Sequence, residues 1–187
     1  PVFEATANHR YNTADYGKID DNLAVKGDFE ASEAYFEEFI ENAHQNGIKI
    51  VLDAVFNHSG FEFFAFQDVV EKGKESKYSD WFYIENYPVK TLYEQRTENI
   101  EPNYQGWAGY GNHPVLNLDN PEVKDYIYQI TEKWMDPNGD GDPSDGIDGW
   151  RLDVANDVKA RHPEFWQEWR NFVKEIKLLN NTAPIYM

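Results

Sequence analysis

The sequence contains no cysteine and few basic residues, and each shortage excludes a class of function. Without cysteine there is no disulfide, no thiolate nucleophile and no zinc site with sulfur ligands. Lysine and arginine number 17 against 34 aspartates and glutamates, so the net charge is −17. Because a phosphate backbone requires a basic face, we expect no nucleic-acid partner. A neutral substrate or a bound cation such as calcium is more compatible with this charge.

Other common signatures are also missing. No run approaches the roughly 20 apolar residues of a membrane span, so we expect none. No secretory leader is visible, and neither PVFEATANHR at the start nor APIYM at the end resembles a natural terminus. The glycine-rich turn of dinucleotide-binding folds is absent, and the five histidines are scattered along the chain. A dehydrogenase and a zinc hydrolase are therefore both disfavoured.

Apolar and aromatic residues, in contrast, are abundant. They make up 41% and 16% of the 187 residues, enough for the core of one domain. An aromatic excess of this size serves packing in most proteins, and the stacking of sugar rings is the alternative use. The composition alone leaves both uses open.

The spacing of apolar residues predicts alternating helices and strands. One helix is expected over residues 31–47, with Phe36, Phe39, Ile40 and Ala43 facing inward. The other expected elements are strands over 48–56 and 147–155, helices over 120–135 and 162–177, and the start of a strand in residues 183–187. This order favours an α/β fold with a parallel sheet, either doubly wound or part of a (β/α)₈ barrel.

The middle of the chain has a different character. Residues 59–115 are aromatic, polar and irregular, with scattered glycine and proline. We interpret them as an elaborate excursion or small subdomain, since a loop this long inside a compact domain is usually functional.

Polar clusters follow two of the expected strands, where working residues gather in α/β folds. One cluster is Asp53, Asn57 and His58, and the other is Arg151, Asp153, Asn156 and Asp157. Arg151 and Asp153 share a strand face, so the guanidinium is expected to hold Asp153 ionised. Such a carboxylate at a pocket mouth is a nucleophile or an electrostatic stabiliser, and the alternative is a purely structural ion pair.

Four stretches together resemble one family. GIKIVLDAVFNH and DGWRLDVAND look like the first two conserved regions of the alpha-amylase family, glycoside hydrolase family 13. NHRYNTADYGKID resembles the segment after the second barrel strand in its neopullulanase and cyclomaltodextrinase branch. HPVLNLDNPEVKDYI resembles the MPKLN signature of that branch, near the end of an inserted B domain. Order and spacing agree over nearly the whole chain.

The resemblance implies a partial TIM (β/α)₈ barrel, from about the second to the fifth strand. Residues 1–58 would form a barrel segment made of the end of the second strand, a helix and the third strand. Residues 59–115 would be the irregular B domain, inserted after that strand. Residues 116–187 would return to the barrel through a helix, the fourth strand, another helix and the start of the fifth strand.

The resemblance also implies roles at matching positions. Asp153 corresponds to the nucleophile of the family and Arg151 to the arginine that orients it. The implied sugar contacts are His9, Tyr11, His58, Asn156 and Asp157. Two positions depart from the branch: Asp157 stands where glutamate is usual, and His113 stands at the methionine of MPKLN. Asp53 and Asn57 are interpreted as supports of the loop.

The implied chemistry is that of a retaining glycosidase. One carboxylate attacks the anomeric carbon while a carboxylic acid roughly 5–5.5 Å away protonates the leaving oxygen. In the family that acid is a glutamate at the end of the next strand, here PIYM, and a third carboxylate follows two strands later. We therefore expect the 187-residue chain to be a piece of an enzyme that turns over no substrate alone.

An acidic loop resembles a D-x-N-x-D-G calcium loop. The sequence DPNGDGDPSDGID sets oxygen ligands at alternate positions, and the resemblance adds Asp148 to close the shell. The expected ligands are Asp136, Asn138, Asp140, Asp142 and Asp148. Their ion would be structural, anchoring the start of the strand that carries Asp153. The alternative is a solvated acidic turn.

Three functional hypotheses remain open. The first is hydrolysis of α-glucosidic bonds in starch-type glucans, maltooligosaccharides, pullulan or cyclodextrins. The second is an α-glucosidase or transglycosylase of the same family. The third is a non-catalytic carbohydrate-binding or transporter-associated relative, which the joint presence of Arg151, Asp153, His58 and Tyr11 disfavours. The resemblance further implies a homodimer for the full-length protein, and the calcium loop favours a secreted or periplasmic location.

Overall fold

The chain begins with a β-hairpin that the apolar pattern did not predict. The structure is a computed structural model, and it describes residues 1–178. Strand β1 (Phe3–Ala5) pairs antiparallel with β2 (Thr13–Ile19), and the register shifts twice along the pair. A short 3₁₀ helix, η1 (Asp21–Leu23), follows. The connection between the strands, residues 6–12, is therefore fixed at both ends by main-chain pairing.

Helix α1 (Phe29–Gln45) confirms the first predicted helix. Asp28 caps its start by accepting a hydrogen bond from the Ala31 N–H at 3.0 Å. Phe36, Ile40 and Ala43 are buried as expected, but Phe39 is 49% exposed, so its predicted inward position is wrong. At 100° per residue, Phe39 lies at the edge of the buried stripe, where its ring stacks on Phe36 with centroids 6.0 Å apart.

The two predicted strands form one parallel pair. Strand β3 (Val51–Ala54) lies beside β4 (Gly149–Leu152), and Asp53 is opposite Arg151 in the register. Both strands are shorter than the apolar runs that predicted them, 48–56 and 147–155. Within the described residues the sheets are this pair and the β1–β2 hairpin.

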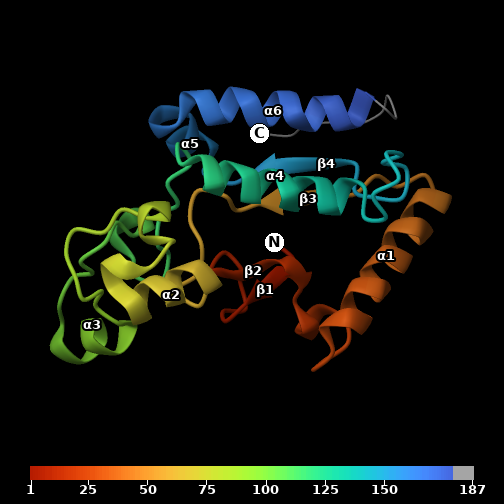
Figure 1. The fold of residues 1–187 in the computed structure, drawn as a ribbon. Helices are drawn as coiled ribbons and strands as arrows, with labels where there is room; N and C mark the ends of the chain where they lie inside the picture. The colour runs from red at the N-terminus through yellow and green to blue at the C-terminus, as the bar shows by residue number, and fades with distance from the viewer. Residues whose placement is uncertain (179–187) are drawn as a thin grey trace.

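Three helices pack around the parallel pair (Figure 1). They are α4 (Pro121–Met135), α5 (Ala155–Arg161) and α6 (Pro163–Leu178). Asn120 caps α4 with Pro121 in its first turn, as predicted. Helix α5 was not predicted, because residues 153–155 were assigned to the preceding strand. The indole of Trp169 ties α6 to α4 by donating a hydrogen bond to the Thr131 hydroxyl at 2.9 Å.

The segment 59–115 is more regular than its sequence suggested. It contains α2 (Phe64–Lys72) and α3 (Leu92–Glu98), with the 3₁₀ helices η2 (Gly73–Glu75), η3 (Ser79–Trp81) and η4 (Trp107–Gly109). The segment returns to its starting point, because the Ser59 N–H donates to the Pro114 carbonyl at 3.0 Å. Its core is aromatic, with Phe66 in edge contact with the Phe82 ring.

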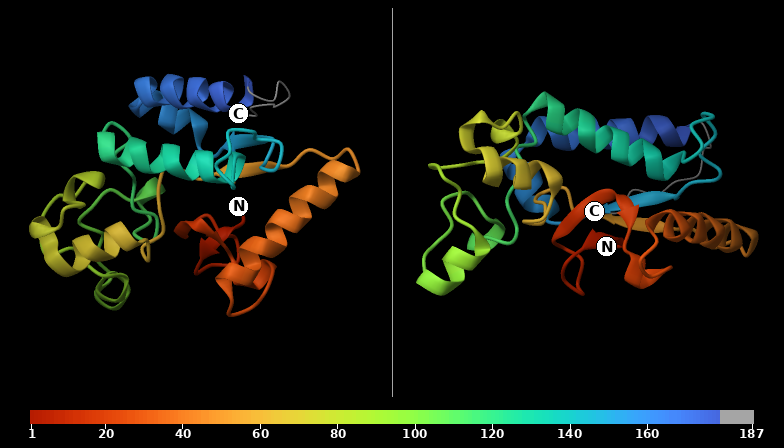
Figure 2. Two further views of the ribbon diagram at one scale, coloured as in Figure 1. Left: turned by 45° about the vertical axis from the view of Figure 1, so that its right-hand side comes forward. Right: turned by 60° about the horizontal axis from the view of Figure 1, so that its bottom comes forward.

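Different elements lie at the two ends of the parallel strand pair (Figures 1 and 2). Strands β3 and β4 run toward the segment 59–115, while α1 and the acidic loop lie at the opposite end. No described helix is long and apolar enough to cross a membrane. The strand expected in residues 183–187 lies outside the described residues.

Candidate active site

A cavity of about 430 Å³ lies where β4 ends. Asp153 and the predicted sugar contacts His9, Tyr11 and His58 line it. The other side is closed by residues 107–113, which come from the end of the segment 59–115. Three parts of the chain that are distant in sequence therefore meet at one carboxylate.

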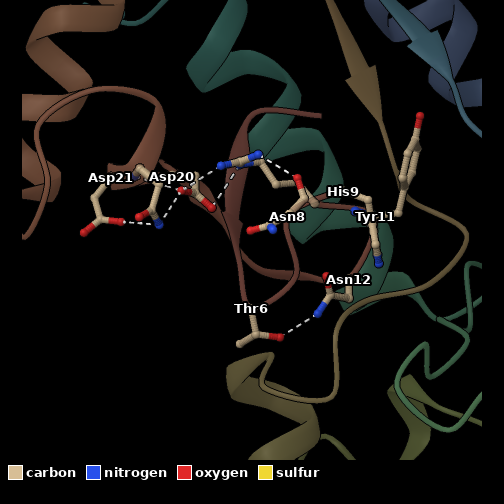
Figure 3. Close-up of polar contacts among 9 residues, drawn as sticks. Thr6, Asn8, His9, Tyr11, Asn12, Asp20 and Asp21 are labelled. Carbon is tan, nitrogen blue, oxygen red and sulfur yellow. Dashed lines mark hydrogen bonds and ion pairs between the residues drawn. The ribbon is translucent and has the colours of Figure 1, made fainter.

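His9 and Tyr11 reach the cavity from the β1–β2 connection. Figure 3 shows Asp20 on one side of this connection and Tyr11 on the other. Arg10, with φ of 59°, forms an ion pair with Asp20 at 3.1 Å. That ion pair and the left-handed turn direct the neighbouring Tyr11 side chain the opposite way, toward the strand ends. Its hydroxyl donates to the Asp53 carboxylate at 3.2 Å.

Arg151 lies between two carboxylates rather than beside one. Its Nη1 is 2.7 Å from Asp53 Oδ1 and 3.0 Å from Asp153 Oδ1. The Arg151 side chain is 48% exposed, while each carboxylate is 13% exposed. Burial and the nearby Asp53 charge raise the pKa of Asp153, and the opposite effect of Arg151 does not offset them. Arg151 therefore opposes this rise, in the direction expected of a guanidinium, but does not reverse it.

His58 is held in one tautomer by a chain of hydrogen bonds. Arg161 donates to the Asn57 amide oxygen, and Asn57 Nδ2 donates to His58 Nδ1 at 3.0 Å. His58 Nε2 therefore carries the hydrogen, which it donates to the Tyr11 carbonyl at 3.1 Å. Burial, followed by the neighbouring His113, lowers the pKa of His58 to about 3, so the ring is neutral. Its face stacks on Trp107 with centroids 5.3 Å apart.

The backbone after Asp153 is strained. Val154 has φ of 53° and ψ of 33°, a left-handed conformation that a β-branched residue rarely adopts. Such a residue costs about 1–3 kcal/mol and persists only where its surroundings enforce it. Here the Asp153 N–H donates to the Ala54 carbonyl at 3.0 Å, and α5 starts immediately afterwards. The turn ends β4 at a fixed point and leaves Asp153 at the cavity.

Asn156 and Asp157 do not line the Asp153 cavity. Both are exposed in the first turn of α5 and border a neighbouring hollow of about 590 Å³, beside Trp166. Val154 borders both hollows, so the two are adjacent. Asp157 is positioned by Trp107, whose indole donates to its carboxylate at 3.3 Å.

The acidic loop folds on itself. Asp136, Asn138, Asp140 and Asp142 each accept a hydrogen bond from a backbone N–H of the loop, at 2.8 to 3.0 Å. Within residues 1–178, no three His, Asp or Glu side chains lie close enough together to form a ready metal site. The carboxylate and amide oxygens of this loop are nevertheless the type of ligand that calcium prefers.

The structure does not bring Asp148 to the other four expected ligands. Its carboxylate binds Lys49 at 2.8 Å, His44 at 2.8 Å and the Ile50 N–H at 2.8 Å. These partners join the base of β3 to β4. Asp145 belongs to the loop itself. Its Oδ1 is buried without a hydrogen-bond partner, and its pKa is raised by burial and by the other loop carboxylates.

Sequence reasoning missed two kinds of site residue. Asp53 was assigned to loop support, yet it is the bidentate partner of Arg151. Its position opposite Arg151 follows from the β3–β4 register, which a single sequence does not reveal. The aromatic wall of residues 107–113 carried no signal beyond an aromatic excess, since its place depends on how the whole segment 59–115 folds.

Comparison with known proteins identifies the family. The family described as "Alpha amylase, catalytic domain" matches residues 1–183. The chain belongs to the alpha-amylase family. Among curated relatives, neopullulanase 2 of Thermoactinomyces vulgaris is 42% identical over 94% of the chain. The maltogenic alpha-amylase of Bacillus acidopullulyticus is 44% identical over 95%. The chain spans about a quarter of each of these relatives, 26% of their length.

Solved structures also match the chain in fold. The Nostoc punctiforme debranching enzyme, soaked with acarbose, matches with a TM-score of 0.81 and 42% identity, over 99% of this chain and 34% of that one. A cyclic alpha-maltosyl-(1→6)-maltose hydrolase from Arthrobacter globiformis matches with a TM-score of 0.80 and 35% identity, over 99% and 36%. The chain is therefore a TIM-barrel fragment of the alpha-amylase family.

Proposed function

We propose that this chain carries the nucleophile of a retaining hydrolase that cleaves α-glucosidic bonds of starch-type glucans. The observation that supports it most is Asp153, held 3.0 Å from Arg151 at the end of β4 in an aromatic-lined cavity. Substrates of this class are supported by the names of the relatives, which include neopullulanases, maltogenic amylases and cyclomaltodextrinases.

The proposed reaction assigns different tasks to the half-buried Asp153 and Asp53. Asp153 attacks the anomeric carbon, and its partial removal from water makes it a more reactive anion. Asp53 binds Arg151 with both oxygens and accepts a hydrogen bond from Tyr11, so its proposed task is to orient the arginine. The proton for the leaving oxygen comes from a second carboxylic acid, roughly 5–5.5 Å from the nucleophile. The resemblance to the family implies that this acid follows the strand predicted for residues 183–187.

The test is Asp153→Asn in the full-length protein, assayed on maltotriose, pullulan and cyclodextrin. The amide keeps the shape of the side chain but cannot form the glycosyl ester, so we expect kcat to fall at least about 10⁴-fold. Glucan cleavage near the wild-type rate would contradict the assignment. Product analysis on the same three substrates separates hydrolysis from transglycosylation and α-glucosidase activity.

We also propose that residues 59–115 are the inserted B domain. The segment leaves the barrel after β3 and returns beside it, as the antiparallel bridge between His58 and Val115 indicates. It supplies the cavity wall of residues 107–113. Its proposed task is to close the sugar-binding side of the active site.

A structural calcium ion in the acidic loop is a further proposal, supported by the oxygen donors and by the unpartnered Asp145 Oδ1. EDTA should lower the Tm of the full-length protein and calcium should restore it. Asp140→Asn should abolish this response to EDTA and calcium. Asp148→Asn, which loses the Lys49 ion pair, should lower the Tm but should still respond to EDTA and calcium. A Tm that chelation leaves unchanged would contradict a bound ion.

The homodimer and the extracytoplasmic location remain predictions.

A further inference from the structure

His113 occupies the centre of the cavity wall although no role has been assigned to it. It is 8% exposed and contacts several rings of the cavity. Its plane lies nearly parallel to His9, with centroids 6.1 Å apart at 18°. It meets His58 edge to face at 4.9 Å and Trp107 at 6.0 Å. These contacts fix the ring in one orientation beside the sugar-binding residues.

The tautomer of His113 is set by its neighbour in the chain. Its Nδ1 lies 2.8 Å from the Asn112 side-chain oxygen, which can only accept, so Nδ1 carries the hydrogen. Burial, with a further contribution from His9, lowers the pKa of His113, so the ring is neutral. Nε2 is therefore an acceptor. It has no hydrogen-bond partner in the described chain and is not among the enclosed unpartnered atoms.

His9 adopts the opposite tautomer. Its Nδ1 accepts from the Tyr11 N–H at 3.1 Å, so this nitrogen carries no hydrogen. Nε2 must then carry it, and this atom is a donor. Two nearly parallel rings at one cavity thus present one acceptor and one donor. A pyranose offers neighbouring hydroxyls on adjacent carbons, each able to donate and to accept.

We propose that His113 is a specificity-determining residue whose Nε2 accepts a hydrogen bond from one hydroxyl of the glucose bound at Asp153, while His9 Nε2–H donates to the adjacent hydroxyl. The inference rests on the proposed function and adds a sugar contact that discriminates among stereoisomers and deoxy sugars. A sugar lacking the hydroxyl leaves the acceptor without a partner, which is the strongest form of hydrogen-bond discrimination.

The experiment compares the full-length wild type with His113→Phe, which keeps a flat ring for packing but removes the acceptor. The substrates are maltotriose and monodeoxy maltotrioses that lack one hydroxyl of the reacting glucose at a time. We expect kcat/KM on maltotriose to fall about 3- to 10-fold in His113→Phe. With one deoxy substrate the two proteins should react equally, because the lost hydroxyl is the partner of His113. The other deoxy substrates should preserve the difference.

The outcomes separate the two proposals. A wild type that does not cleave maltotriose overturns the proposed function. If the wild type is active and the kcat/KM of His113→Phe lies within twofold of it on every substrate, the role of His113 is overturned and the proposed function stands. A second measurement is independent of the folding of that variant: a crystal structure of full-length Asp153→Asn with maltotriose. His113 Nε2 should lie within about 3.2 Å of a sugar hydroxyl. A bound sugar that leaves this atom in contact with water only also overturns the inference.

Discussion

At the scale of single residues, the site depends on one guanidinium shared by two carboxylates. Arg151 lies 2.7 Å from Asp53 and 3.0 Å from Asp153, so its charge is divided between them. Asp53 fixes the orientation of the arginine, and the arginine limits the rise in the pKa of Asp153 that burial causes. The ionised form of Asp153, the proposed nucleophile, thus depends on both neighbours.

Arg151→Gln should therefore shift the acidic limb of the pH–rate profile. Without the cation, the two carboxylates repel each other and the pKa of Asp153 rises further. A nucleophile must be ionised, so the limb moves to higher pH and kcat/KM at pH 7 falls about 100-fold. Arg151→Lys, the matched control, keeps the charge and should shift the limb less. An acidic limb that stays in place in Arg151→Gln would refute this coupling.

His58 makes a prediction about stability. Its pKa is about 3 in the fold and 6.5 in the unfolded chain, so below pH 6.5 the unfolded chain binds the extra proton. Stability is present in full above pH 6.5 and is lost as the pH falls toward 3. Between pH 7.5 and 5, the wild type should lose about 2 kcal/mol more of its free energy of unfolding than His58→Gln. Denaturant titrations at the two pH values measure this, and equal losses would contradict a buried neutral ring.

At the scale of elements, the approach of two loops is set by one glycine. The Gly60 N–H donates to the Thr13 carbonyl at 2.7 Å, which ties the exit of β3 to the end of the β1–β2 connection. A Cβ at this position would lie 2.5 Å from the Asn12 carbonyl oxygen, a backbone atom that cannot move alone. Only glycine permits this distance, so the placement of His9 and Tyr11 depends on it.

Gly60→Ala should accordingly lower stability by about 1–3 kcal/mol and raise KM, because the connection carrying the sugar contacts is displaced. Gly17→Ala is the matched control. A Cβ there would lie 3.3 Å from the Asp15 carboxylate, a flexible side chain, so little loss is expected. Melting curves and maltotriose kinetics of both variants in the full-length protein decide the question. A Gly60→Ala protein as stable and active as the control would contradict the tight approach.

Elements with one clear periodicity were predictable from the sequence. Helices α1, α4 and α6 follow apolar stripes, and β3 and β4 lie within mostly apolar runs. Helix α5 was missed because the strained Val154, where the strand turns into a helix, looks in sequence like one more strand residue. The β1–β2 hairpin was missed because its register shifts break the alternation on which a prediction depends.

At the scale of the whole molecule, the site is a meeting of distant segments. The carboxylate of Asp153 follows β4, the predicted sugar contacts are His9, Tyr11 and His58, and the wall comes from residues 107–113. Local patterns indicated the strand ends, while the roles of His9 and Tyr11 came from a resemblance to a family. Neither local patterns nor the family resemblance predicted the aromatic wall, because its position follows from long-range packing of the segment 59–115.

The most direct test of the nucleophile is to trap it. The full-length protein is incubated with a slowly reacting fluorinated maltosyl fluoride, then digested and analysed by mass spectrometry. A retaining mechanism through Asp153 predicts one glycosyl ester on the peptide that contains Asp153, and none in Asp153→Asn. An adduct on another carboxylate, or a product with inverted anomeric configuration and no adduct, would contradict it.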